Sequence, residues 1–402
     1  MMLSSNALKI SLLSVAVAAM STQAMAEVSD PIKSAFKNAT TNVGFRYRAE
    51  SVDQTGKEDA LASTLKSRIT VKSGDIYGAS VLMEVDDVTV LGSDRYNDLT
   101  GDTNRTKYAT VVDPEYTEVN QAALMYNAPA NTKLTYGRQR VIFDNQRFVG
   151  GVGWRQNEQT FDGVTLSNTA LDRTTLTYGY IYNVNTIRGL DIDGGKHHLV
   201  NARFDASPAL SVTGYAYLLD KLSAAIESHD TYGVSAKGKI PSGDIGLLYQ
   251  AEYATQSVDA TVDYDADYYF LEGGAEIKGI TAKLGYEVQT SDDGKGAFTT
   301  PLGTNHAFNG WADLFLTTPV NGLEDLYLSV STPLLGPALT VAYHDFSAET
   351  GGADYGSEID VSVAKTFAES YTVLLKFADF STDKADQFAD TQKIWLQLEA
   401  AF

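Results

Sequence analysis

The feature that most constrains the fold of this chain is an alternation of apolar and polar side chains with a period of two, which recurs in short segments from residue 41 onward. In residues 41–51, Val43, Phe45 and Tyr47 occupy one set of alternate positions, and Gly, Asn, Arg and Glu occupy the other. Successive side chains of a strand point to opposite faces, so this period predicts strands with one apolar and one polar face. The same pattern returns in residues 65–72, 77–86, 174–184, 245–255 and 280–288. Each segment is about ten residues long, which is the length of a tilted transmembrane strand.

The two ends of the chain place these strands in an exported membrane protein. Lys9, the apolar run at residues 10–20 and the Ala24-Met25-Ala26 sequence form a secretory signal peptide, so residues 1–26 are expected to be cleaved. Residues 27–402 then form a single barrel domain. The last strand, residues 394–402, alternates to its end and closes on Phe402. Such an ending resembles the C-terminal strand of outer-membrane barrels, which the barrel-insertion machinery reads.

The connections between strands alternate between short and long. Treating residues 306–322 as part of one long loop preserves this alternation and predicts 18 strands, although 16 also fits. The predicted fold class is therefore all-β, a transmembrane antiparallel up-and-down β-barrel in the bacterial outer membrane, with short periplasmic turns and long extracellular loops. A barrel of this size encloses a water-filled lumen, which makes a pore the expected function.

The positions of the charged residues indicate which face of each strand lines the lumen. Charged side chains opposite the apolar faces are expected to line the lumen: Arg46, Arg48, Lys66, Arg68, Lys72, Arg203, Lys237, Lys239 and Lys283, with the acids Glu50, Glu84, Asp86, Glu252, Glu287, Glu358 and Asp360. The formal net charge of −20 argues against nucleic-acid binding. Acidic outer loops are expected to be solvated, and an alternative is that they hold divalent cations that bridge lipopolysaccharide phosphates.

The sequence contains no complete catalytic or metal-binding motif. Asp263, Asp265 and Asp267 open like a calcium loop, but Tyr268 stands where Gly is required and Gly274 where Glu is required. His197 and His198 are adjacent, so a strand would point them to opposite faces. No nucleophile motif accompanies the five histidines, and no cysteine is present. The chain is therefore expected to be no enzyme and to need no metal or cofactor.

The stretch at residues 136–163 is the predicted constriction. It gathers four arginines and two acids: Arg138, Arg140, Arg147 and Arg155, with Asp144 and Asp162. Phe148 and Trp154 are expected to pack against the barrel wall, which would fold the loop inward and present its guanidinium groups to passing anions. Arg138 and Arg140 share strand parity with the lipid-facing Tyr136, so either the strand ends at Tyr136 or a bulge near Gly137 reverses the alternation.

Several blocks resemble a known family. Gly137-Arg138-Gln139, Asn145-Gln146-Arg147-Phe148-Val149-Gly150, Trp154-Arg155-Gln156-Asn157 and Thr160-Phe161-Asp162-Gly163 are similar to the alginate-export-type family of outer-membrane porins, and residues 306–313 resemble a second block of such porins. The resemblance implies an 18-stranded monomeric barrel with an arginine-lined, anion-favouring constriction. In that constriction Arg138, Arg140, Arg147 and Arg155 would select the solute, and Asp144 and Asp162 would orient them.

These observations favour a passive porin for small hydrophilic, preferentially anionic solutes. The alternative is an exporter of an anionic polysaccharide such as alginate, and an outer-membrane hydrolase is the third hypothesis. The expected partners are outer-membrane lipid and lipopolysaccharide, the barrel-insertion machinery through Phe402, and the transported solutes.

Overall fold

The computed structural model describes residues 30–333, 336–383 and 387–402. The predicted signal peptide, residues 1–26, lies outside the described residues. The elements within them are α2 (Asp30–Lys37), β1 (Thr40–Gln54), β2 (Ala60–Lys72), β3 (Ala79–Arg95), β4 (Thr117–Ala128), β5 (Thr132–Gln139), β6 (Thr160–Asn168), β7 (Thr174–Asn185), β8 (Asp191–Ser207), β9 (Leu210–Ser223), β10 (Ile226–Ser242), β11 (Ile245–Ala260), β12 (Tyr264–Ile277), β13 (Ile280–Gln289), η2 (Asn305–Ala307), β14 (Leu323–Pro333), β15 (Ala338–Ser347), β16 (Asp354–Phe367), β17 (Tyr371–Ser381) and β18 (Thr391–Ala401). In this part of the chain, no helix is long and apolar enough to cross a bilayer.

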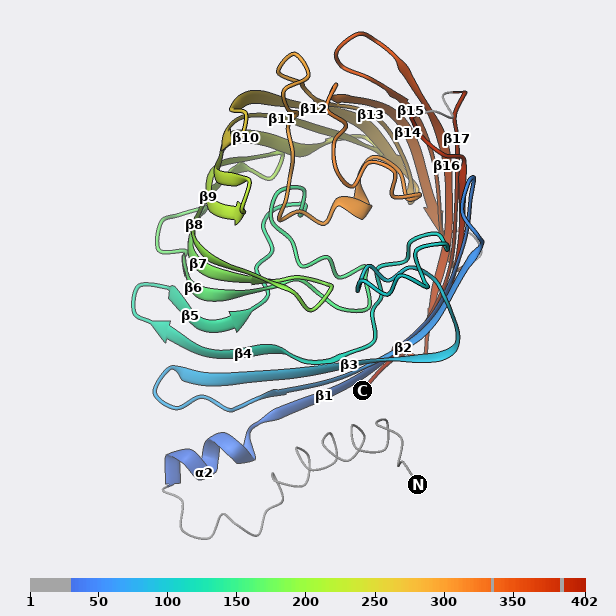
Figure 1. Cartoon of the computed structure of the whole chain (residues 1–402). Helices are drawn as coiled ribbons and strands as arrows, with labels where there is room; N and C mark the ends of the chain where they lie inside the picture. The colour runs from blue at the N-terminus through green and yellow to red at the C-terminus, as the bar shows by residue number, and fades with distance from the viewer. Residues whose placement is uncertain (1–29, 334–335, 384–386) are drawn as a thin grey trace, which may run out of the picture.

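The 18 strands close into a barrel (Figure 1). Each strand pairs antiparallel with the next one along the chain, and β1 pairs with β18, so that Gly44 lies opposite Ala401 and Gln54 lies opposite Thr391. The predicted count of 18 is confirmed. Residues 306–322 belong to the long connection between β13 and β14, as the alternation of connections required.

The period-two pattern separates the two faces of the wall. Leu247, Tyr253, Leu271 and Leu284 are between 42% and 61% exposed and form part of an apolar outer surface. The alternate residues of the same strands face inward and carry most of the charges. Closure removes free strand edges, and the apolar outer face suits contact with lipid.

Several strands are longer than the ten residues expected from the sequence. β3, β8 and β10 each have 17 residues. The outer connections at 186–190 and 224–225 are correspondingly short. Ladder hydrogen bonding continues beyond the apolar band into the outer rim, where neither face needs to be apolar, so the alternation of the sequence fades before the strand ends.

Candidate pore constriction

Two outer connections fold into the barrel and meet inside it (Figure 1). Residues 140–159, the first inward loop, join β5 to β6, and residues 290–322, the second inward loop, join β13 to β14. Val149 pairs with Leu302 in a parallel β-bridge. The amide of Gly150 donates to the carbonyl of Leu302 at 2.9 Å. The two loops therefore form one joined body in the lumen.

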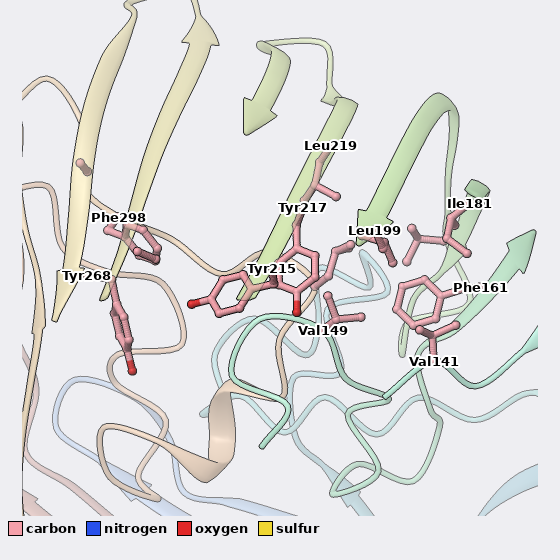
Figure 2. Close-up of a cluster of buried hydrophobic side chains, with 14 of the residues drawn as sticks. Val141, Val149, Phe161, Ile181, Leu199, Tyr215, Tyr217, Leu219, Tyr268 and Phe298 are labelled. Atoms are coloured by element: carbon pink, nitrogen blue, oxygen red, sulfur yellow. The ribbon is translucent and has the colours of Figure 1, made fainter. Parts of the chain in front are cut away.

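Apolar packing anchors the first inward loop to the wall, as its aromatic residues predicted. The ring of Phe148 lies 5.0 Å from that of Tyr215 and 5.4 Å from that of Tyr268, and 6.0 Å from that of Phe298 in the second inward loop. Val149 is 1% exposed, and Figure 2 shows it within the cluster of buried side chains that includes both tyrosines. Each such side chain contributes about 1.5–3 kcal/mol when fully buried.

Arg147 is buried in this body, which corrects the expectation that it presents a free guanidinium to the lumen. Its side chain is 1% exposed. Nε donates to Oε1 of Glu287 at 2.7 Å, and Nη2 donates to Oδ1 of Asn309 at 2.9 Å. Burial lowers the pKa of Arg147, but the attraction of Glu287 outweighs burial and the pKa is raised. A guanidinium removed from water needs such partners, so Arg147 holds the first inward loop to the second one and to β13.

Arg155 is also buried and paired, which corrects the expectation that its guanidinium is presented to passing anions. Its side chain is 5% exposed; Nη1 donates to Glu50 at 3.0 Å and Nη2 to Asp313 at 2.8 Å. Lys393 of β18 donates to the same carboxylate of Asp313 at 2.7 Å. Burial raises the pKa of Asp313, but His306 and Lys393 outweigh burial, and the pKa lies well below the usual range. Asp313 therefore links both inward loops to the wall as a carboxylate.

A band of paired charges joins the wall to the first inward loop. Its members are Lys66, Arg68 and Arg140, with Glu84, Asp86 and Glu158. Arg68 donates to Asp86 at 2.6 Å, and Arg140 donates through Nε to Glu158 at 2.7 Å. Burial raises the pKa of Glu158, but Lys66, Arg68 and Arg140 outweigh burial and lower it to about 2. Arg140 thus lies in the lumen, as predicted, but in a network rather than free.

Arg46 differs from these arginines because its contacts are uncharged. It donates through Nε to Gln156 at 2.8 Å, through Nη1 to the carbonyl of Gly153 at 2.9 Å, and through Nη2 to the carbonyl of Arg155. Among the described residues, no carboxylate lies within 4.0 Å of Arg46 or of the wall residue Lys237. Arg46 therefore places positive charge beside the first inward loop without a directly bound counter-ion.

Arg138 and Asp162 lie on the other face of the wall, so their predicted place in the constriction is wrong. β5 continues in regular pairing to Gln139, with Arg138 opposite Asp162. Arg138 therefore shares the outward face of Tyr136, which is 55% exposed. The guanidinium binds the carboxylate of Asp162 through Nε at 2.9 Å and Nη2 at 3.1 Å.

The two alternatives proposed for the register near Gly137 are both wrong. The strand does not end at Tyr136, and its pairing does not slip at Gly137, which has a φ of +115°. A Cβ at this glycine would collide with the carbonyl of Ala122. Because β5 ends at Gln139, Arg140 is free of strand alternation and turns inward.

Asp144 has a role different from the one expected. It accepts a hydrogen bond from Nδ2 of Asn201 at 2.7 Å and one from Oγ1 of Thr213 at 3.5 Å. Both donors belong to the wall, and no arginine ion pair of Asp144 occurs among the described residues. Asp144 thus ties the first inward loop to β8 and β9.

The acids of β16 face inward, as predicted, and hold the second inward loop. Glu358 accepts hydrogen bonds from the amides of Trp311 and Ala312, the latter at 2.7 Å, and Asp360 accepts one from the amide of Trp311 at 3.2 Å. Gly310 precedes these amides with a φ of +81°. Residues 306–313 were expected to lie in a long outer loop and to resemble a block of known porins, but their place in the site was not predicted. The Asn309-Gly310 pair, a common turn signal, was the local clue.

Four of the remaining predicted lining residues lie together in a cavity away from the inward loops. Arg203, Lys237, Lys239 and Lys283 line one cavity of about 680 Å³ at the periplasmic end of the lumen. Three of them have acid partners: Arg203 with Asp205, Lys239 with Glu276 and Lys283 with Glu272. Arg48 is buried and lies within 3.7 Å of Asp113, while Lys72 is exposed at the end of β2.

The closed barrel, its apolar outer face and its charged lumen define an outer-membrane β-barrel of the porin type. The chain belongs to the alginate export family, whose model matches residues 39–292. The fold is similar to that of OpdK from Pseudomonas aeruginosa, solved with vanillate, at 15% identity and a TM-score of 0.70, over 91% of this chain and 99% of that one. OccK9 (OpdG) of the same organism has 15% identity and a TM-score of 0.71, and OccAB4 of Acinetobacter baumannii has 14% and 0.69, each over 91% of this chain and 99% of its own. No curated protein sequence matches the chain.

Proposed function

We propose that the protein is a porin through which small hydrophilic solutes, preferentially anions, diffuse passively across the outer membrane. The observation that carries this proposal is the joined body of two inward loops inside a closed, charge-lined barrel. A barrel of this size holds water, and a rigid loop body narrows that water to a selective passage.

The preference for anions is supported by the distribution of paired and unpaired charge. Arg147 and Arg155 are neutralised by buried carboxylates, whereas Arg46 binds uncharged acceptors. A guanidinium of this kind attracts carboxylates and phosphates and repels cations. The fold neighbour OpdK was solved with vanillate, a carboxylate, which is consistent with this solute class.

The test is the reversal potential of the reconstituted protein in a planar bilayer under a salt gradient. We expect a potential of the sign that anion selectivity gives, and a smaller one for Arg46→Gln. Arg138→Gln is the matched control, because Arg138 lies on the outward face, and it should leave the potential unchanged. A cation-selective potential would refute the anion preference, and the absence of conductance would refute the pore.

A second and less favoured candidate is the export of an anionic polysaccharide, which only the description of the matching family suggests. An exporter should hold its polymer during transit, so oligouronate added on the periplasmic side would block the conductance at low concentration. A passive porin would show block only at high concentration.

We further propose that the protein has no catalytic function. Support comes from the environment of the buried His306, which binds Lys376 and Asp313 rather than a hydroxyl nucleophile. Lipid hydrolysis by the purified barrel that is lost in His306→Gln would contradict this proposal.

The proposed partners follow from the surface. The apolar outer face contacts membrane lipid. We propose that lipopolysaccharide surrounds the outer rim. The insertion machinery would bind β18, whose alternation ends at Phe402 with its ring 5.8 Å from that of Tyr371. Removal of Phe402 should then slow barrel assembly in vesicles that contain the machinery.

A further inference from the structure

All three tryptophans of the chain surround one buried lysine. The ammonium nitrogen of Lys376, on β17, lies 4.2 Å from the ring centre of Trp154, 3.7 Å from that of Trp311 and 5.4 Å from that of Trp395. Trp154 belongs to the first inward loop, Trp311 to the second, and Trp395 to β18. One charged group therefore contacts both loops and the wall at the same point.

The same ammonium group begins a chain of hydrogen bonds. Lys376 Nζ donates to Nε2 of His306 at 2.7 Å, and Nδ1 of His306 donates to Asp313 at 2.6 Å. This direction requires a neutral imidazole that accepts at one nitrogen and donates at the other. Asp313 in turn accepts from Arg155 and Lys393. These hydrogen bonds thus connect β17 through the second inward loop to the first inward loop and to β18.

Stacking reinforces the arrangement. The ring of Trp154 lies parallel to that of His306, with 4.5 Å between centres and an angle of 4°. The guanidinium carbon of Arg48, on β1, lies 4.1 Å from the ring centre of Trp154. Lys376 is 8% exposed, so little water competes with the aromatic faces for its charge. Cation–π attraction is strongest with tryptophan and in such dry surroundings.

We propose that Lys376 is the positioning residue that holds the two inward loops at a fixed distance from the β17–β18 wall and so sets the aperture of the pore. This inference rests on the proposed porin function. Each loop contacts this ammonium group through a tryptophan, so its loss removes one wall contact of Trp154 and one of Trp311 at the same time. Loss of one desolvated cation–π contact shifts the equilibrium between docked and released loop by about 30-fold.

The experiment compares Lys376→Met with the wild-type protein. Methionine keeps the length and apolar character of the lysine stem but removes the charge. Because every tryptophan lies in this cluster, tryptophan fluorescence that is excited selectively over the 23 tyrosines reports on this site alone. We expect acrylamide to quench the fluorescence of folded Lys376→Met several-fold more strongly, and we expect several conductance levels in a bilayer instead of one. Lys376→Arg, which keeps a cation, should recover most of both wild-type values.

The matched control is Lys283→Met, the same substitution at a lysine 37% exposed in the periplasmic cavity, which should alter neither quenching nor the number of levels. Wild-type quenching and a single level in Lys376→Met would overturn the inference. If that variant does not fold, Trp154→Leu tests the same contact. Trp311 and Trp395 should then become more accessible to acrylamide, and unchanged quenching would overturn the inference. An absence of conductance in the wild type would refute the porin, while the quenching comparison would still decide the role of Lys376.

Discussion

The buried pair of Arg147 and Glu287 gives the sharpest prediction about what holds the loops inside the barrel. Arg147→Met removes a guanidinium that is 1% exposed and leaves a carboxylate that is 3% exposed without its cation. Glu287 retains a hydrogen bond from Asn309 Nδ2 at 3.1 Å, so its negative charge remains in place. The single substitution therefore leaves an uncompensated charge between two loops and β13.

The expected cost follows from this burial. Breaking a buried ion pair on one side costs about 3–5 kcal/mol, whereas replacing both partners by uncharged groups is often close to neutral. Arg147→Met should therefore lower the free energy of unfolding by about 3–5 kcal/mol. The double variant Arg147→Met/Glu287→Gln should recover most of that loss, because no charge is left unpaired.

The assay is guanidinium titration of the barrel in detergent micelles, combined with limited proteolysis of residues 140–159. Arg203→Met is the control: its ion pair with Asp205 is 47% and 46% exposed, and such a pair contributes about 0–1 kcal/mol. The reasoning is refuted if Arg147→Met is as stable as Arg203→Met, or if the double variant is less stable than the single one.

Three further predictions concern the same loops. Gly310→Ala should loosen the second inward loop, because φ is +81° and the new Cβ would overlap the carboxylate of Glu358. The docked loop should lose about 1–3 kcal/mol of stability, and faster protease cleavage of residues 290–322 should report this loss. Glu158 has a pKa lowered from 4.5 to about 2, so its stabilising contribution of about 3 kcal/mol is complete above pH 4.5 and is lost as the pH falls toward 2. Single-channel noise should therefore rise between pH 5 and pH 3 in the wild type, and less in Glu158→Gln; equal profiles would contradict this assignment. Arg140→Gln should reduce the reversal potential, since Glu84 and Glu158 then lose a cation, and an unchanged potential would exclude Arg140 from selectivity.

Most of the fold could be predicted from local pattern. Alternation in segments such as residues 245–255 identified the strands and their outward faces, which the exposure of Leu247 and Tyr253 bears out. The need to bring both chain ends to one side gave an even number of strands. Phe148 was also informative, because an aromatic residue in a loop of a lipid-embedded barrel finds its apolar surroundings on the inner wall.

The partners of the charged residues could not be predicted. Arg147 binds Glu287, 140 positions away along the chain, and no local pattern links the two. The sequence shows that the arginines gather in the first inward loop, but their neutralisation depends on the second loop folding onto them. The register near Gly137 was predicted wrongly for a different reason. A glycine with a positive φ can continue a strand without reversing its alternation, so the parity with Tyr136 holds and the expected inward position of Arg138 is wrong.

The most direct test of the loop body uses the absence of cysteine from the chain. Val149 and Leu302 pair across the two inward loops, so the double variant V149C/L302C places two thiols at their junction. We expect mild oxidation of the folded barrel to form this disulfide in full and to leave the single-channel conductance and the reversal potential at their wild-type values. Failure of the disulfide to form in the folded barrel, or a conductance that changes when it forms, would contradict a constriction built from two loops already joined in the open pore.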